Sequence, residues 1–136
     1  MTHDNRRAAI ARELEHGGKA LAAARLLREA ALYNDALSRL YYALFHHVAA
    51  LLLTEGVDPS SHSALPGLLG KHFVLHGRLT ASDVAIVSRT AGYRNLADYE
   101  RTWDAPMDVV DGAFTEVLGL VARIESVLTE GAWIAQ

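Results

Sequence analysis

Four side chains that could act on a phosphate lie along one face of a predicted helix. Asp35, Arg39, Tyr42 and His46 are spaced by four, three and four residues, which places them within about 60° of one another on a helix. Histidine can transfer protons near neutral pH, arginine presents a fixed fork of donors to phosphate, and tyrosine rings can stack on exposed bases. The same stripe becomes apolar towards Leu53. Because neither a solvent face nor a core stripe explains this change, we expect the four side chains to line a cleft.

Five helices are expected to position this stripe. The chain is rich in strong helix formers and shows neither a period-two strand pattern nor an internal repeat. The expected helices span residues 6–31, 35–55, 66–76, 81–103 and 107–129. We therefore predict an all-α fold, an up-and-down bundle of four to five helices.

Residues with known preferences at helix ends support these boundaries. Asn34 is expected to cap the second helix, and Gly56 offers a left-handed stop after it. Thr80 is expected to cap the fourth helix, with Asp83 answering it at the third helical position. The pair of glycines at 17–18 is the one weak point of the first helix, where its axis could kink.

Composition limits the class of protein. The 136 residues, 51% hydrophobic and 21% charged, predict one globular domain over 1–136. A net charge of −3 argues against a surface that binds nucleic acid over its whole extent. The chain has no cysteine, so disulfides and zinc–thiolate sites are excluded. The polar beginning and the short apolar run "VAALLL" predict no signal peptide and no membrane span, hence a cytoplasmic protein.

Three stretches of the chain resemble the HEPN domain superfamily. They are "YNDALSRLYYALFHHVAALLLTEGV", "SSHSALPGLL" and "YRNLADYE", in order and spacing, so the resemblance covers about residues 20–127. Small stand-alone bacterial and archaeal members share the patterns Ser-Arg-x-Tyr-Tyr-Ala-x-Phe-His and Arg-x-x-Ala-Asp-Tyr. The resemblance implies a helical bundle that forms a homodimer. Many members are metal-independent ribonucleases, often toxins encoded beside a minimal nucleotidyltransferase antitoxin, and others bind nucleotides or act as assembly modules.

The resemblance also implies roles for the early motif. The ribonuclease signature of the superfamily is an arginine and a histidine with four to six residues between them, and Arg39 and His46 meet it with six. On this interpretation both are catalytic: Arg39 binds phosphate and His46 transfers a proton while the 2′-hydroxyl attacks. Tyr42 would stack on a base or orient the substrate.

The late motif is predicted to bind RNA or nucleotide rather than to cleave it. Arg94, Asn95 and Tyr99 are the expected binding residues. Many active members carry a histidine one helical turn after this arginine, but Asp98 stands at that position here. A carboxylate is repelled by phosphate, so we expect Asp98 to be structural and to pair with Arg39 or Arg94.

A second function class stays open, a catalytically silent HEPN module that binds nucleotide, RNA or a partner protein. On that interpretation His46 is a core or interface histidine, and Arg39 only pairs with Asp35 or Asp98. The tyrosines at 41 and 42 would then be core or dimer residues.

The remaining histidines are expected to be structural. His62 lies in the loop "SSHS" and is predicted to cap a helix, as a structural polar residue like Asp35 and Asp98. His72 and His76 have a spacing found in metal sites, but no third ligand accompanies them. We therefore expect no metal and no cofactor.

Overall fold

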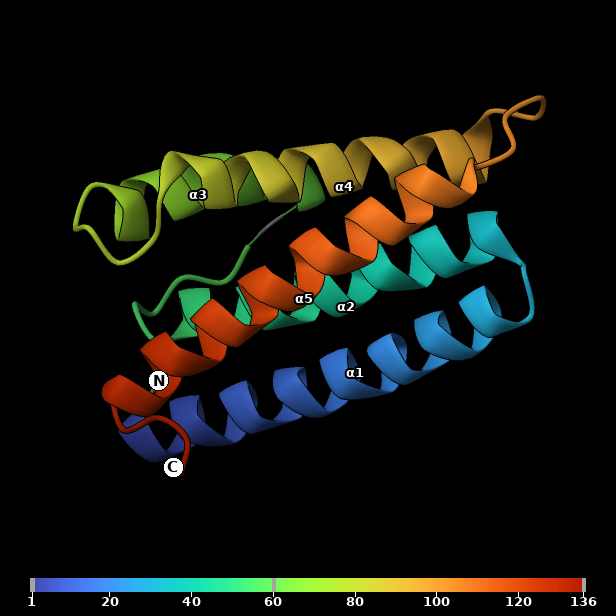
Figure 1. The fold of residues 1–136 in the computed structure, drawn as a ribbon. Helices are drawn as coiled ribbons and strands as arrows, with labels where there is room; N and C mark the ends of the chain where they lie inside the picture. Colours follow the sequence, from blue (N-terminus) through green and yellow to red (C-terminus); the bar gives the residue numbers. More distant parts are fainter. Residues whose placement is uncertain (1, 60, 136) are drawn as a thin grey trace.

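The computed structural model describes residues 2–59 and 61–135, and all regular elements within these ranges are helical (Figure 1). The predicted all-α bundle is confirmed. The longer helices are α1 (His3–Glu29), α2 (Tyr33–Leu53), α4 (Ala81–Tyr99) and α5 (Met107–Glu130). The expected third helix consists of three short pieces: a 3-10 turn (His62–Ala64), α3 (Leu65–Leu69) and a π-helical turn (Gly70–Val74).

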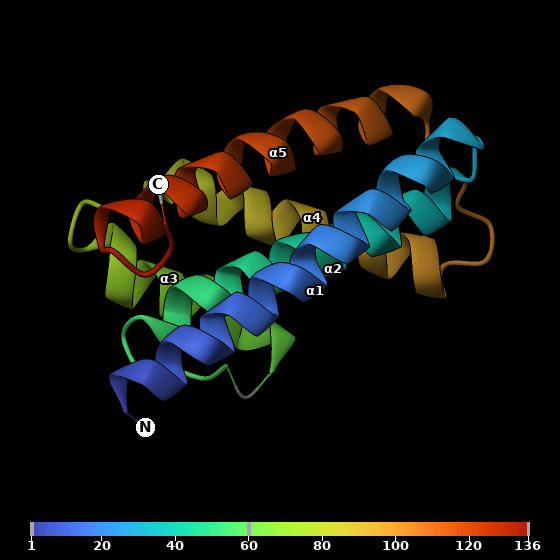
Figure 2. The same cartoon turned by 90° about the horizontal axis from the view of Figure 1, so that it is seen from below.

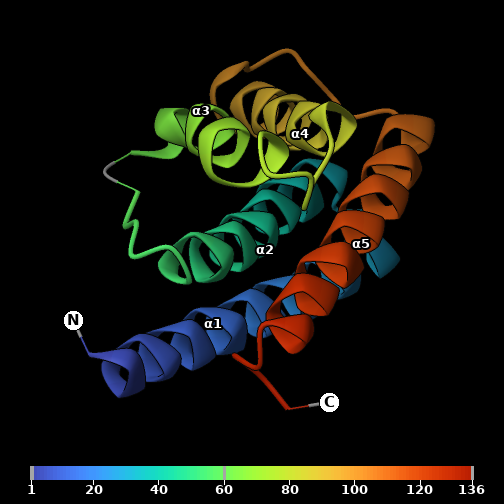
Figure 3. The same ribbon diagram turned by 90° about the vertical axis from the view of Figure 1, so that its left-hand side faces the viewer.

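Helix α2 lies at the centre of the bundle. Figure 3 shows α1 on one side of it, α3 and α4 on the other, and α5 along a third side. Figure 2 shows that α1 and α2 run side by side. The two are joined by a connection of only three residues, 30–32. Because α2 touches every other long helix, its side chains form part of the interface with each of them.

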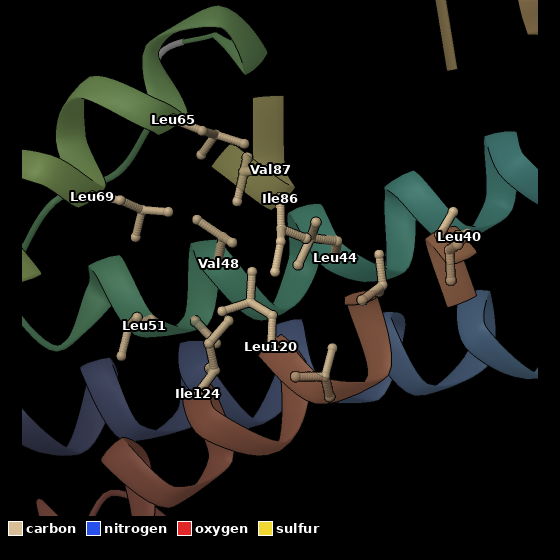
Figure 4. Packing of buried hydrophobic residues seen from close by; sticks show 14 of the residues in the cluster. Leu40, Leu44, Val48, Leu51, Leu65, Leu69, Ile86, Val87, Leu120 and Ile124 are labelled. Atoms are coloured by element: carbon tan, nitrogen blue, oxygen red, sulfur yellow. The ribbon is translucent and has the colours of Figure 1, made fainter. Parts of the chain in front are cut away.

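The core lies between α2, α4 and α5. Figure 4 shows Leu44 and Val48 of α2 packed near Ile86 of α4 and Leu120 of α5. The leucines at 51–53 are buried, as predicted. Helix α2 is long and apolar enough to cross a membrane, but 67% of its apolar window is buried inside the bundle. Its apolar composition is therefore that of a core helix.

The helix ends follow the predicted signals in part. Thr80 and Asp83 form the expected capping box, and Gly56 has a φ of +71° just after α2. Asn34 is not the cap of α2, because the helix already begins at Tyr33. Its side chain instead binds the backbone of residues 103 and 105, at 2.9 Å each. This contact belongs to the turn that ends α4 at Tyr99, four residues earlier than predicted.

Helix α1 is continuous from His3 to Glu29, so the glycine pair at 17–18 does not break it. Gly17 serves a different purpose. A Cβ atom there would lie 2.7 Å from the ring of His47 on α2 and 3.3 Å from the Cβ of His46. Glycine therefore allows α1 to approach α2 closely at this level. Gly18 has no neighbour of this kind within 4 Å.

Candidate functional site

A groove of about 460 Å³ runs between α1 and α2 beside this close approach. Three residues of the predicted stripe, Arg39, Tyr42 and His46, line it from α2. The opposite wall comes from α1, and the residues there are His16, Lys19, Ala20 and Ala23. The small alanines leave the space open, and the charged groups along the lining are cationic. The groove therefore suits an anion such as a phosphate.

His46 is held in a fixed orientation within the groove. Its Nδ1 lies 2.7 Å from Oε2 of Glu13 on α1, and both side chains are partly accessible, at 26% and 30%. A carboxylate that accepts a hydrogen bond from Nδ1–H fixes the imidazole tautomer and leaves Nε2 free to accept a proton. The ring of His16 is next to that of His46, with a distance of 5.4 Å between ring centroids. This arrangement can transfer protons.

The polar end of the predicted stripe does not belong to the groove. Asp35 is exposed in the first turn of α2 and lines a separate hollow with Asp104, near the turn that Asn34 holds. The prediction that Asp35 shares a cleft with the other three is therefore wrong. Arg39 makes no ion pair among the described residues, so the expected pairs with Asp35 and Asp98 are absent. Its guanidinium lies 5.4 Å from the centroid of the Tyr42 ring.

Arg94 of α4 joins the site through Tyr42. Its Nη2 donates to the Tyr42 hydroxyl at 2.9 Å. Its Nε is 3.1 Å from the carboxylate of Asp98, an ion-pair contact without the alignment of a hydrogen bond. Asp98 therefore pairs with Arg94, one of its two predicted partners. The same carboxylate also accepts a hydrogen bond from the Ser38 hydroxyl at 3.2 Å. Burial works to lower the pKa of Arg94, but Tyr42, Tyr99 and Asp98 raise it overall, so the guanidinium stays charged.

A second hollow, which we call the α4 pocket, has a volume of about 410 Å³ and lies between α2, α3 and α4. Its polar lining includes Tyr41, His62, Arg94 and Asn95, and its apolar lining includes Val87. Asn95 is thus placed where the late motif predicted a binding residue, beside Arg94. The ring of Tyr99 is 5.4 Å from the Arg94 guanidinium and is 72% exposed. It lies outside this lining.

His62 does not cap a helix, so that prediction is wrong. It is the first residue of the 3-10 turn, and its Nδ1 lies 2.9 Å from the hydroxyl of Tyr41. Its ring stacks on Phe45 at 4.2 Å. Burial and the nearby Arg94 lower the pKa of His62, and burial raises the pKa of Tyr41. His62 is therefore a structural polar residue, but it acts through tertiary contacts with α2 and not through a helix cap.

Two adjacent tyrosines of α2 line the groove and the α4 pocket, one in each hollow. Tyr42 lines the groove and Tyr41 lines the pocket, and their ring centroids are 5.7 Å apart. The Arg94 guanidinium lies within 6 Å of both ring centroids, at 5.9 and 5.5 Å. The Arg94 cation therefore lies close to residues of both hollows, Tyr42 in the groove and Tyr41 in the α4 pocket.

The sequence interpretation missed every contribution from α1. Glu13, His16 and Lys19 were not among the expected site residues. They lie on one helical face, but their importance depends on the partner helix and on the close approach at Gly17. Glutamate, histidine and lysine on a helix surface are common, so no local pattern distinguishes these three.

No group of three histidine, aspartate or glutamate side chains in residues 2–59 and 61–135 is arranged to hold a metal ion. His72 and His76 are therefore not part of such a cluster.

The helices α2 and α4 and their motifs lie within the region of the chain that matches a known family. The HEPN domain profile matches residues 11–130, nearly the whole chain. The chain belongs to the HEPN domain family. This HEPN protein is 36% identical over 111 residues to a protein of Methanocaldococcus jannaschii named "Putative toxin MJ0605", a match that covers 81% of each chain.

Two further proteins are similar in sequence to this chain. "Putative toxin MJ0142" of the same organism is 34% identical over 89 residues, which is 65% of this chain and 60% of the relative. A "UPF0332 protein" of Thermotoga maritima is 28% identical over 107 residues, which is 79% of this chain and 81% of the relative. Family membership therefore rests on most of the bundle, including α1 from residue 11 onward.

Proposed function

We propose that this HEPN protein is a metal-independent endoribonuclease that acts as the toxin of a toxin–antitoxin pair in the cytoplasm. The observation that carries the proposal is the pair formed by Glu13 and His46, 2.7 Å apart in an open groove that Arg39 also lines. The names of the two Methanocaldococcus relatives support the toxin part of the proposal.

The groove residues can carry out the chemistry of RNA cleavage. His46 accepts the proton of a 2′-hydroxyl through Nε2, while Glu13 holds Nδ1–H. The 2′-oxygen then forms a bond to phosphorus and the bond from phosphorus to the 5′-oxygen breaks, which leaves a 2′,3′-cyclic phosphate. The departing 5′-oxygen takes up a proton and becomes a hydroxyl. Arg39 balances the charge on the phosphate.

Total RNA incubated with purified protein in excess chelator tests this proposal. We expect cleavage by the wild type and a loss of roughly 10²- to 10⁴-fold in rate for His46→Ala. The melting temperature of that variant should remain near that of the wild type, because the side chain is partly exposed. His76→Ala is the matched control, since His76 is exposed and lies outside the groove and the α4 pocket. Absence of cleavage by the wild type contradicts the proposal.

A second candidate function, nucleotide binding without cleavage, is favoured by the α4 pocket. This pocket offers a permanently charged arginine and the Asn95 amide around about 410 Å³, enough for a mononucleotide. If wild type does not cleave RNA but binds nucleotide, and Arg94→Gln abolishes that binding, this second function replaces the first.

We also propose that the protein forms a homodimer and is inhibited by a minimal nucleotidyltransferase antitoxin. Tyr99 and Leu96 on α4, which are 72% and 38% exposed, place apolar surface next to Arg94. Such surface is typical of interfaces. Light scattering at micromolar concentration should give twice the 14.8 kDa mass of one chain. Co-expression with a nucleotidyltransferase encoded next to it should suppress toxicity.

A further inference from the structure

A second histidine faces the proposed catalytic histidine across the groove. His16 lies on α1, one helical turn after Glu13, and is exposed to solvent. Its ring centroid is 5.4 Å from that of His46, with the two ring planes inclined at 31°. Rings at this separation can each place a nitrogen within about 3 Å of a different oxygen of one phosphate.

The close packing of α1 against α2 accounts for this placement. Gly17 follows His16 directly and lies against the ring of His47. The backbones of α1 and α2 therefore approach each other closely beside the two histidines, which brings His16 next to His46. His16 also has no salt-bridge or hydrogen-bond partner among the described side chains, so both of its nitrogens are available for a ligand.

We propose that His16 is the general acid of RNA cleavage, opposite His46 as the general base. The inference rests on the proposed function and adds a residue to it. Glu13 occupies Nδ1 of His46, which leaves Nε2 of His46 to accept the proton of the 2′-hydroxyl. His16, in its charged form, gives its proton to the 5′-oxygen as the bond from phosphorus to that oxygen breaks. One proton enters the pair and one leaves it, so a turnover is completed when His46 passes its proton to water and His16 takes one up.

Other charged or titratable groups surround the two histidines and affect both. Lys19 lines the groove and is paired with Glu15 at 3.2 Å on the exposed side of α1. The groups to be considered in any pH profile come from α1, α2 and the 3-10 turn, and they are Glu13, Glu15, Lys19, Arg39, His47 and His62. His16 and His46 are the two histidines among the groove lining residues, so the proposed acid and the proposed base both come from this groove.

The leaving group provides the decisive test. An oxygen leaving group needs an acid, whereas a sulfur leaving group departs as a thiolate without one. We therefore compare an RNA oligonucleotide that the wild type cleaves with the same oligonucleotide carrying sulfur in place of the 5′-oxygen at the mapped cleavage site. His16→Ala should slow cleavage of the normal RNA by about 10²-fold or more. It should cleave the sulfur-containing RNA at nearly the wild-type rate.

The pH profile of the same variant gives a second readout. Wild-type kcat/KM should be bell-shaped, because the base must be neutral and the acid charged. The His16→Ala variant should lose the decline at high pH and keep the rise at low pH. His46→Ala should be slow on both RNAs, and the control His76→Ala should behave as the wild type.

The possible failures are distinguishable. If the wild type cleaves RNA but His16→Ala slows both RNAs equally, or cleaves both as the wild type does, His16 is not the acid and only this inference is overturned. If the wild type cleaves neither RNA, the proposed function is overturned and this inference with it.

Discussion

Two adjacent histidines of α2 have opposite surroundings. His47 is 4% exposed, presses against Gly17 of α1, and its Nδ1 lies 2.7 Å from the carbonyl oxygen of Ala43 in its own helix. His46 lies beside it but points into the groove, where Glu13 holds one nitrogen and leaves the other accessible. The side of α2 that carries His47 is therefore closed by packing, whereas the preceding residue, His46, lines an open groove.

The difference shows how packing can position a reactive group. Nδ1 of His47 is bonded within its own helix, Nε2 lies 3.8 Å from Glu125 of α5, and the ring fills the contact with α1. The close approach that results brings Glu13 and His16 alongside His46. On this view the packed contact of His47 holds α1 and α2 together. The arrangement of Glu13, His16 and His46 can then stay fixed although these side chains are accessible to solvent. Mutations on the two sides should therefore have different consequences.

The largest expected difference in stability is between His47→Ala and His46→Ala. Truncation of the buried His47 should lower the free energy of unfolding by about 2–3 kcal/mol, because it leaves a cavity at the α1–α2 contact. Truncation of His46 should cost less than about 1 kcal/mol, since its pair with Glu13 is partly solvated. Urea unfolding of the two variants measures both values. Equal losses would mean that His46 is part of the packed core.

The two neighbouring glycines of α1 offer the next comparison. Gly17→Ala places a Cβ 2.7 Å from the His47 ring and should cost about 1–3 kcal/mol through overpacking. Gly18→Ala meets nothing within 4 Å and should stabilise the helix by up to about 1 kcal/mol. Thermal unfolding should move in opposite directions for the two variants. A destabilised Gly18→Ala would indicate that α1 is not a regular helix at this point.

These glycines also illustrate how much could be predicted from the sequence. Helix number, most boundaries and the capping box of Thr80 follow from local signals, and the structure confirms them. Periodicity also placed Arg39, Tyr42 and His46 on one face, and they share a groove. From the sequence alone, the glycine pair indicates only a weak point in the helix. The role of Gly17 depends on the ring of His47 on another helix, which no local pattern reveals.

The errors have the same physical origin. Asn34 and His62 are residue types that often cap helices, but each binds a segment far along the chain, at residues 103–105 and at Tyr41. Local propensity cannot show such tertiary contacts. For the same reason, the sequence alone did not indicate that Glu13 and His16 complete the groove.

A smaller effect is expected at the border between the core and the open side. The Tyr41 ring is buried, and its hydroxyl lies 2.9 Å from Nδ1 of His62. Tyr41→Phe keeps the ring and removes only this hydrogen bond, so it should cost about 1 kcal/mol. Urea unfolding measures the change, and the double variant with His62→Gln should be less destabilised than the sum of the two. Full additivity would argue that the contact contributes nothing.

The smallest expected effect is a pH dependence that comes from His62. Burial, together with the charges of Arg94 and His46, lowers the pKa of His62 below its usual value of 6.5. The unfolded chain therefore binds a proton at a higher pH than the folded chain does. Stability contributed by neutral His62 is fully present above about pH 6.5 and is lost as the pH falls from there through the lower folded pKa.

Melting temperatures of wild type and His62→Gln at pH 7.5 and pH 5.5 isolate this contribution, because the other six histidines are present in both proteins. The wild type should lose more of its melting temperature on acidification than the variant does. An equal or larger loss in His62→Gln would show that protonation of His62 is tolerated in the fold. The 3-10 turn would then accept a charge beside Arg94. The α4 pocket would be more open to solvent than the contacts of His62 with Phe45 and Tyr41 indicate.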